Sequence, residues 1–426
     1  MDITGYSVAS SVRISVSGNT AIISNLENGK WIRVPREAID VLSGETKDDM
    51  MKKCLNAGFS ANDSLDFIKA LHDYGFINFG LEDVSKNRPA RLLSSAYLNV
   101  TDRCNLSCLH CYFGSSNKLS HGVSIKSTFH IVDKLYEAGV RFLTVSGGEA
   151  VLKPGINRLF AYLNEKKFTE ITLLTNGTAI SERMAKIIAR YVDHVRVSLD
   201  GPNEQINSQV RGKGNFQRAM AGIEKLKDVG AKSIRMITTI TSKNLAFMED
   251  IEEIADKLGI QFGTSIFTPV GTGKQNYFLK PSLPGLLEYF RKKVREEKFK
   301  LSTLEHSLGI DAGITCGCGM QMISIDCGGN VYPCHLFHIP EMKIGNIIEC
   351  PNLLEMIEES AVIRKIRKFT IENRECHRCR VEYFCKGGCL ARTVFHNQHF
   401  DNPWVKRDPL CRLHEEIFSM QLWDEV

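Results

Sequence analysis

Alternating apolar and polar residues near the start of the chain predict a small sheet followed by helices. The sheet is expected from three runs separated by the turn signals Gly18-Asn19 and Asn28-Gly29, namely Val12–Ser17, Thr20–Leu26 and Lys30–Val34. Helical patterns and one short strand follow at Pro35–Leu42, Asp48–Ala57, Ala61–Tyr74 and Gly75–Phe79. The polar stretch Gly80–Arg91 contains Pro89 and is typical of a linker, so residues 1–90 are expected to form an α+β domain plus its linker.

From Ser94 onward, short apolar runs alternate with helical patterns. Strands are expected at Ala96–Val100, Phe142–Ser146, Ile171–Thr175, Val195–Leu199, Ile234–Thr239 and Phe262–Phe267. Helices are expected at Ser124–Ala138, Ile156–Lys166, Ser181–Tyr191, Asn215–Val229, Ala246–Leu258 and Leu283–Lys298. Repeated strand–helix units predict an α/β domain over residues 91–299, with a parallel sheet that is open or curled into a partial barrel.

Polar segments follow five of these expected strands. In chain order they are Thr101–Cys111, Gly147-Gly148-Glu149, Asn176-Gly177, Asp200-Gly201 and Pro269–Gly273. Each segment alone suits an ordinary turn, because turns also favour Gly, Asn and Asp. Ligands in such folds bind at the carboxyl ends of the strands, so the coincidence predicts one shared site there.

The composition is that of a globular protein with many cysteines. The chain has 426 residues, 43% hydrophobic and 24% charged, and its net charge of +5 gives no strong case for nucleic acid. It begins without a secretory signal, and no apolar run approaches the roughly 20 residues that span a bilayer, so a soluble, cytoplasmic protein without a membrane partner is expected. In a reducing compartment, 14 cysteines favour metal ligands over disulfides.

The cysteines are unevenly distributed. Three lie within residues 104–111, ten within residues 316–411, and Cys54 stands apart. Residues 300–426 form a third, loop-rich unit, in which Cys and Gly take the place of a large apolar core. Metal sites are therefore expected to hold this unit together.

The spacing Cys104-x3-Cys108-x2-Cys111 supplies three thiolates within a short loop. Three ligands suit a four-iron cluster whose fourth iron stays open to a small molecule. A zinc loop that borrows a fourth ligand such as His110 remains the alternative from spacing alone, although structural zinc sites usually come as two CxxC-like pairs.

Residues Asn99–Tyr112 resemble the signature loop of radical SAM enzymes, and the resemblance extends over about residues 94–285. It implies a partial (β/α)6 TIM-like barrel, and a [4Fe–4S] cluster on Cys104, Cys108 and Cys111 that reductively cleaves S-adenosylmethionine to a 5′-deoxyadenosyl radical. The positions that the resemblance assigns to S-adenosylmethionine are His110, Tyr112, Gly147, Gly148, Glu149, Asn176, Ser198, Asp200, Arg211 and Val270.

Within this set, Gly147-Gly148-Glu149 resembles the motif that binds the methionine amino group. Arg211 is expected on a loop as a carboxylate partner, because a guanidinium pairs bidentately, with an ordinary surface arginine as the alternative. No residue is identified as a general base.

The C-terminal cysteines are similar in order to those of SPASM domains, which hold two auxiliary [4Fe–4S] clusters. This resemblance implies three clusters in the whole protein. The inner auxiliary cluster would be held by Cys316, Cys318, Cys334 and Cys389, with Cys327 as the alternative to Cys318 or with one iron left open. The outer cluster would be held by Cys376, Cys379, Cys385 and Cys411, while Cys54 and Cys350 are expected to be buried without a ligand role.

The first domain resembles the winged-helix-like, PqqD-like modules that bind the leader of a ribosomal precursor peptide as an added strand. A small structural or dimerising domain is the alternative. Together the three units resemble peptide maturases of the thioether-forming (sactipeptide or ranthipeptide) kind, reduced by a partner such as flavodoxin or ferredoxin. Carbon–carbon crosslinking, sulfatase-type formylglycine maturation and a zinc-stabilised peptide-binding protein remain alternatives.

Overall fold

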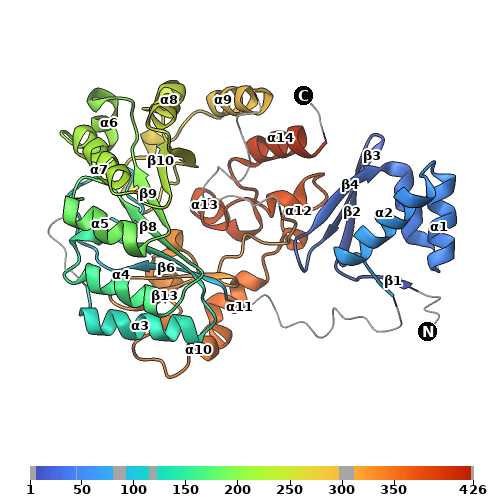
Figure 1. The fold of residues 1–426 in the computed structure, drawn as a ribbon, viewed down its shortest axis with the longest axis horizontal. Coiled ribbons are helices and arrows are strands. Elements are labelled where there is room, and N and C mark those ends of the chain that lie inside the picture. Colours follow the sequence, from blue (N-terminus) through green and yellow to red (C-terminus); the bar gives the residue numbers. More distant parts are fainter. Residues whose placement is uncertain (1–5, 45, 80–92, 115–121, 297–310, 424–426) are drawn as a thin grey trace.

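The computed structural model describes residues 6–44, 46–79, 93–114, 122–296 and 311–423 (Figure 1). The expected linker Gly80–Arg91 lies outside these ranges. None of the described helices is both long and apolar enough to cross a bilayer.

The N-terminal unit is a three-stranded antiparallel sheet with helices on one face. Its elements are β1 (Tyr6–Val8), β2 (Val12–Ser17), β3 (Thr20–Asn25), β4 (Trp31–Pro35), the 3-10 helix η1 (Arg36–Ser43), α1 (Lys47–Asn56), α2 (Ala61–Asp73) and β5 (Ile77–Phe79). The sheet order is β2-β3-β4, and β1 pairs separately with β5. Thr46 and Ser60 cap α1 and α2 through their side-chain oxygens. Each expected strand and helix of this unit is confirmed, except that the first helix is of the 3-10 type.

The six expected strands of the second unit are confirmed and lie side by side in chain order, all parallel. They are β6 (Ser95–Asn99), β7 (Phe142–Ser146), β8 (Glu170–Thr175), β9 (His194–Ser198), β10 (Ile234–Ile240) and β11 (Gln261–Ile266). The covering helices are α3 (Ile125–Glu137), α4 (Ile156–Glu165), α5 (Glu182–Tyr191), α6 (Glu204–Arg211), α7 (Phe216–Asp228), α8 (Met248–Leu258) and α9 (Leu283–Arg295). The sequence pattern missed α6, which ends at Arg211, so that the expectation of a loop there was wrong.

Apolar residues fix this order of strands. Leu98, Val145, Leu173 and Val195 are buried in one cluster with the inner faces of α3, α4 and α5. Because parallel strands run in the same direction, their carboxyl ends share one edge. The polar segments after β6, β7, β8 and β9 therefore meet at that edge.

The third unit extends the same sheet. β12 (Met322–Ile325) pairs in parallel with β6, and β13 (Asn330–Tyr332) and β14 (Gly345–Asn346) follow in antiparallel order. Its helices are α10 (Leu353–Glu359), α11 (Ala361–Arg367), α12 (Glu382–Cys385), α13 (Leu390–His396) and α14 (Cys411–Leu422). The C-terminal unit is thus continuous with the barrel sheet.

The third unit also has an apolar core, which the sequence pattern did not predict. Phe337, Phe395 and Trp404 pack together with the buried side chains of Cys318 and Cys334. Phe337 and Trp404 stack at 6.0 Å between ring centroids. Apolar packing therefore supports this unit around its thiols.

The N-terminal sheet docks against the C-terminal unit beside α12 (Figure 1). Trp31 of β4 meets the ring of Phe384 edge to face at 5.4 Å, and Ala312 N donates to Gly29 O at 2.8 Å. Ile22 of β3 is fully buried in the cluster that contains Phe384. One face of the N-terminal sheet thus packs on its own helices and the opposite face on the C-terminal unit.

Candidate functional site

The cysteine-bearing loop that follows β6 is held down by the glycine pair after β7. Gly148 N donates to Thr101 O at 2.7 Å, and Glu149 N donates to Arg103 O at 2.9 Å. A Cβ atom at Gly147 would lie 2.2 Å from Thr101 O, and one at Gly148 would lie 2.4 Å from Arg103 O. The two backbones approach so closely that only glycine fits at either position.

The loop that follows β11 also contacts the cysteine-bearing loop. Thr272 N donates to Cys111 O at 2.9 Å, and Asn276 Nδ2 donates to Leu109 O at 3.0 Å. Gly271 has φ of 57°, and a Cβ atom there would lie 2.3 Å from Tyr112 O. The glycine-bearing turn 270–273 therefore contacts the cysteine-bearing loop, whereas the Val270 side chain is buried among apolar residues and does not line the cavity.

The thiols of Cys104, Cys108 and Cys111 lie close enough to influence one another's ionisation. Burial raises the pKa of Cys104 to about 11 and that of Cys108 to about 12. A positive charge must therefore be supplied before both become thiolates, as happens when a metal centre binds and the thiols release their protons.

Glu149 is a buried carboxylate that organises the end of β8. Its Oε1 accepts from Thr175 Oγ1 at 2.7 Å, and its Oε2 accepts from Asn176 N at 2.7 Å. Burial raises the pKa of Glu149 despite these hydrogen bonds. Asn176 in turn directs its amide nitrogen to Asn105 Oδ1 at 2.9 Å and to Cys104 Sγ at 3.8 Å. The Glu149 side chain thus supports the cysteine-bearing loop from behind and does not itself line the cavity.

Asp200, His110 and Arg211 form a buried charged group on the other side of the loop. Arg211 Nε lies 2.6 Å and His110 Nε2 lies 3.1 Å from Asp200 Oδ2. Thr239 N also donates to Asp200 Oδ1 at 2.8 Å. Burial alone would raise the pKa of Asp200, but Arg211 and His110 outweigh it and lower this pKa to about 2. Arg211 is buried in this ion pair, so the surface-arginine alternative is wrong.

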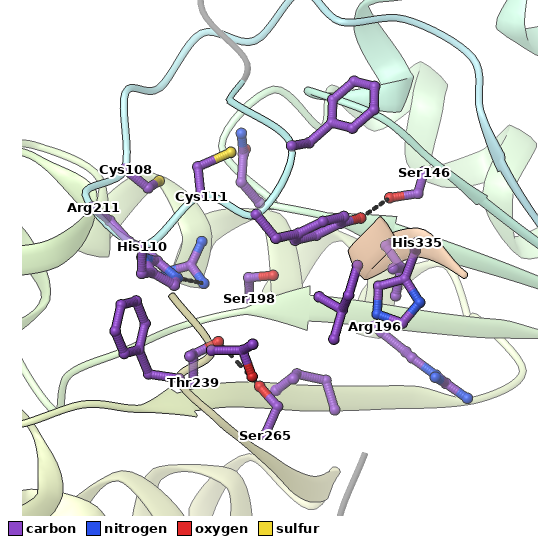
Figure 2. A pocket seen from close by; sticks show the side chains of 18 of the residues that line it. Cys108, His110, Cys111, Ser146, Arg196, Ser198, Arg211, Thr239, Ser265 and His335 are labelled. Carbon is purple, nitrogen blue, oxygen red and sulfur yellow. Dashed lines mark hydrogen bonds between the residues drawn. The ribbon is translucent and has the colours of Figure 1, made fainter. Parts of the chain in front are cut away.

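These elements surround one large cavity, which contains about 1440 Å³ of empty space up to its open mouth. Figure 2 shows Cys108, His110 and Arg211 on one side of it and His335 and Arg196 on the other. The residues predicted for the radical SAM cluster and for S-adenosylmethionine that line it are Cys104, Cys108, Cys111, His110, Tyr112, Gly147, Gly148, Asn176, Ser198 and Arg211. Glu149, Asp200 and Val270 lie behind its wall.

The predicted ligands of the inner auxiliary cluster lie close together, and one of them reaches the cavity. Cys318 interacts with both Cys316 and Cys334, and Cys389 lies within electrostatic range of Cys316 and Cys334. Cys389 also lines the cavity. Cys327 lies elsewhere, beside Asp102 and Lys153. The arrangement therefore favours Cys318 over the alternative Cys327.

The predicted ligands of the outer cluster gather in a second place. Cys385 interacts electrostatically with Cys376, Cys379 and Cys411, and burial raises its pKa above the range of an ordinary thiol. Cys54 and Cys350 belong to neither group. Both are buried, and Cys350 donates to the Ile347 carbonyl.

Several residues that line the cavity were not predicted from the sequence. They are Ser146, Arg196, Thr239, Ser265, His335, Arg392 and His414. The Tyr112 hydroxyl lies 3.3 Å from Ser146 Oγ. Thr239 Oγ1 lies 3.1 Å from Ser265 Oγ, and a dashed line marks this hydrogen bond in Figure 2. The inward alternation of β9 signals Arg196, since Ser198 two residues later also lines the cavity. Nothing in the local sequence signals Arg392 or His414, which reach the cavity from the C-terminal unit.

Comparison with known proteins identifies two domains in the chain. A model of the radical SAM superfamily matches residues 98–258, and a model of the SPASM iron–sulfur cluster-binding domain matches residues 316–380. The mycofactocin maturase MftC of Mycobacterium tuberculosis (strain CDC 1551 / Oshkosh) is 27% identical over 324 residues, which are 73% of this chain and 81% of that protein. The subtilosin biosynthesis protein AlbA of Bacillus subtilis is 28% identical over 331 residues, 74% of this chain and 72% of that protein.

Other similar proteins include an enzyme named for a different reaction and a solved structure with the same fold. An AdoMet-dependent heme synthase of Methanosarcina barkeri is 28% identical over 73% of this chain and 94% of its own length. The crystal structure of Streptococcus suis SuiB bound to S-adenosylmethionine has the same fold, with a TM-score of 0.61 and 17% identity over 95% of this chain and 100% of that one.

The two domain matches imply iron–sulfur clusters and binding of S-adenosylmethionine, in agreement with the grouped thiols and the cavity between them. They also set aside the alternative of a zinc-stabilised binding protein without catalytic activity. The chain is therefore an enzyme with a radical SAM domain at residues 98–258 and a SPASM iron–sulfur cluster-binding domain at residues 316–380.

Proposed function

We propose that this enzyme matures a ribosomally made precursor peptide by joining a cysteine sulfur to a carbon of an acceptor residue. The observation that carries the proposal is the shared cavity. Its wall contains both the thiols of the radical SAM loop and Cys389 of the C-terminal unit. An enzyme that removes hydrogen and also accepts an electron needs two such centres near one substrate.

The three groups of thiols suit three [4Fe–4S] clusters, because four thiolates, or three with one open iron, are the usual ligands of such clusters. Among the described residues, no three His, Cys, Asp or Glu side chains converge on one point that could hold a metal ion. We therefore infer the cluster sites from the shared surroundings of the thiols and from the domain matches.

The cavity also suits S-adenosylmethionine beside the first cluster. When bound, that cluster and S-adenosylmethionine supply the 5′-deoxyadenosyl radical that removes hydrogen from the substrate. Asn176 holds the cysteine-bearing loop in place through Asn105 and Cys104. His110 presents a buried Nδ1 without a hydrogen-bond partner among the described residues, which suits a bound polar ligand.

The N-terminal sheet offers an edge for the leader peptide. Ser17 and Thr20 close a two-residue hairpin, so this pair is hydrogen-bonded. Alternation along β2 therefore directs the N–H groups of Ile14 and Val16 away from β3, to an edge that pairs with no strand among the described residues. Both side chains are also exposed, at 40% and 43%. An extended peptide would add to this edge through backbone hydrogen bonds. SuiB, whose fold covers 96% of this chain, has been crystallised with its precursor peptide.

Thioether formation removes two hydrogens from the peptide. One leaves the acceptor carbon as an abstracted hydrogen atom, and the other leaves the thiol as a proton when sulfur bonds to that carbon. The remaining electron would be accepted by an auxiliary cluster held by the C-terminal cysteines, and an external acceptor would then reoxidise that cluster. A flavodoxin or ferredoxin partner supplies the electron that starts each turnover.

The test uses the reduced, reconstituted enzyme with S-adenosylmethionine and a Cys-containing precursor encoded beside its gene. The expected product is lighter by two hydrogens and has lost one alkylatable thiol, and Cys104→Ala serves as the inactive control. The same mass loss with every thiol still alkylatable would indicate a carbon–carbon crosslink. Loss of the sulfur itself would indicate formylglycine maturation. An unchanged peptide despite cleavage of S-adenosylmethionine would refute the peptide function.

Leader binding is tested separately. Val16→Pro removes one outward N–H without breaking the ladder to β3, and should weaken peptide binding about tenfold, as expected for one lost hydrogen bond of about 1–1.5 kcal/mol. Val16→Thr keeps the N–H and should bind like the wild type. Equal affinity of both variants and the wild type would exclude this edge as the leader site.

A further inference from the structure

A buried polar group lies between the two sets of C-terminal thiols. It consists of Arg392 from α13, Asp408 from the turn before α14, and His414 from α14, whose exposed fractions are 9%, 3% and 2%. Arg392 Nε and Nη2 donate to the two oxygens of Asp408, each at 2.8 Å. A charged pair this deeply buried is costly unless it is fully hydrogen-bonded, which makes its location informative.

Asp408 and Arg392 fasten the group to Cys389, a predicted ligand of the inner cluster. Asp408 Oδ2 accepts from Cys389 N at 2.7 Å, and Arg392 N donates to Cys389 Sγ at 3.4 Å. A Cβ atom at Gly388 would lie 2.5 Å from Asp408 Oδ2, so the preceding glycine allows this approach.

His414 reaches the other set of thiols. Its Nδ1 lies 3.7 Å from Cys385 Sγ, and its Nε2 lies 3.4 Å from Arg392 Nη2. A guanidinium has only donors, so Nε2 must accept and the imidazole proton must sit on Nδ1. That N–H then points at Cys385, a predicted ligand of the outer cluster.

Hydrogen bonds to ligand sulfurs stabilise the more negative, reduced form of an iron–sulfur cluster and so raise its reduction potential. Arg392 and His414 also line the substrate cavity. We propose that Arg392 and Asp408 orient His414 as a hydrogen-bond donor to Cys385, and that this donor raises the reduction potential of the outer cluster. His414 acts here as a positioning and tuning residue. This inference rests on the cluster assignment of the proposed function.

The test is a redox titration of the reconstituted full-length enzyme followed by electron paramagnetic resonance. At the potential where the outer cluster of the wild type is half reduced, His414→Phe should show a roughly tenfold lower ratio of reduced to oxidised cluster, equivalent to about 59 mV for one electron. His414→Gln keeps an N–H donor and should retain most of the wild-type potential. His396→Phe alters a histidine of α13 whose Nδ1 lies 3.4 Å from the Tyr277 hydroxyl, and should leave the potential unchanged.

A wild-type potential in His414→Phe, or an equally lowered one in His414→Gln, would overturn the inference. If His414→Phe loses iron, the result for His414→Gln decides. A His414→Gln variant with the iron content and potential of the wild type supports the inference. A His414→Gln variant with wild-type iron content but a tenfold lower ratio of reduced to oxidised cluster refutes it. Absence of an outer-cluster signal in the wild type would overturn both the cluster assignment and the inference. An unmodified peptide combined with the expected shift would overturn only the peptide function.

Discussion

Replacing Asp200 by Asn should destabilise the barrel strongly, because it leaves the buried Arg211 without its counter-charge. Asp200 is fully buried, and the two side chains meet at 2.6 Å. Asparagine has nearly the same shape, so packing changes little and the lost charge dominates. Removing one partner of a buried ion pair typically costs about 3–5 kcal/mol.

The depressed pKa of Asp200 gives a second, smaller value for the stability that the ionised Asp200 contributes to the fold. It falls from 3.8 to about 2, which corresponds to about 2 kcal/mol. Because the folded-state pKa is depressed, this stability is fully present above about pH 4 and is lost as the pH falls through the folded-state value of about 2. The Asn variant should therefore lack this part of the acid dependence.

Thermal unfolding of the wild type and the variant, prepared in parallel without oxygen, provides the assay. For a cooperative unit of the barrel's size, about 3–5 kcal/mol corresponds to a midpoint lowered by about 6–20 °C. Glu253→Gln is the matched control, because Glu253 pairs with Lys257 on an exposed helix surface and should change stability by less than about 0.5 kcal/mol.

The double variant Asp200→Asn with Arg211→Met separates charge from packing. It should recover at least about 2 kcal/mol relative to the sum of the single variants, since no buried charge is then left unpaired. Midpoints for Asp200→Asn within 2 °C of the wild type, or strictly additive losses in the double variant, would refute the reasoning.

Three further predictions concern the site itself. Glu149→Gln should weaken binding of S-adenosylmethionine about 10- to 100-fold by calorimetry, because a charged hydrogen bond worth about 1.5–3 kcal/mol no longer holds the end of β8; unchanged affinity would contradict this supporting role. Cys318→Ala should lower the iron content by up to about four of about twelve atoms, whereas Cys327→Ala should retain it, and the opposite result would reassign the ligand. Gly148→Ala should abolish cleavage of S-adenosylmethionine, since its methyl group would lie 2.4 Å from Arg103 O; wild-type turnover would show that the loop can shift.

The cavity brings together two sets of predicted functional residues that lie far apart in the chain. The radical SAM loop and the strand ends after β7, β8 and β9 form one wall, while Cys389, Arg392 and His414 reach the same space from the C-terminal unit. β12 links the two units, because it pairs in parallel with β6 and its carboxyl end, at Ile325, lies beside Leu98, just before the cysteine-bearing loop. The substrate would thus lie between the site of hydrogen removal and the nearest predicted auxiliary cluster.

The sequence by itself determined the barrel strands, the grouping of the cysteines and many of the residues that line the cavity. Short apolar runs followed by Gly, Asn, Asp or Cys define parallel strands and their polar ends, and both signals are local. The thiols at 104, 108 and 111 were recognisable for the same reason, since a short loop brings them together without help from the rest of the chain.

Only the tertiary structure decided which side chains line the cavity and which support it from behind. Glu149 and Asp200 carry the charges that a sequence pattern assigns to a ligand, yet both are buried beneath the wall and paired with protein groups. The choice between Cys318 and Cys327, nine residues apart in the chain, likewise depends on which thiol folds back toward Cys316 and Cys334. Arg392, Asp408 and His414 meet through contacts between separate helices, and such long-range packing leaves no periodic or local trace in the sequence.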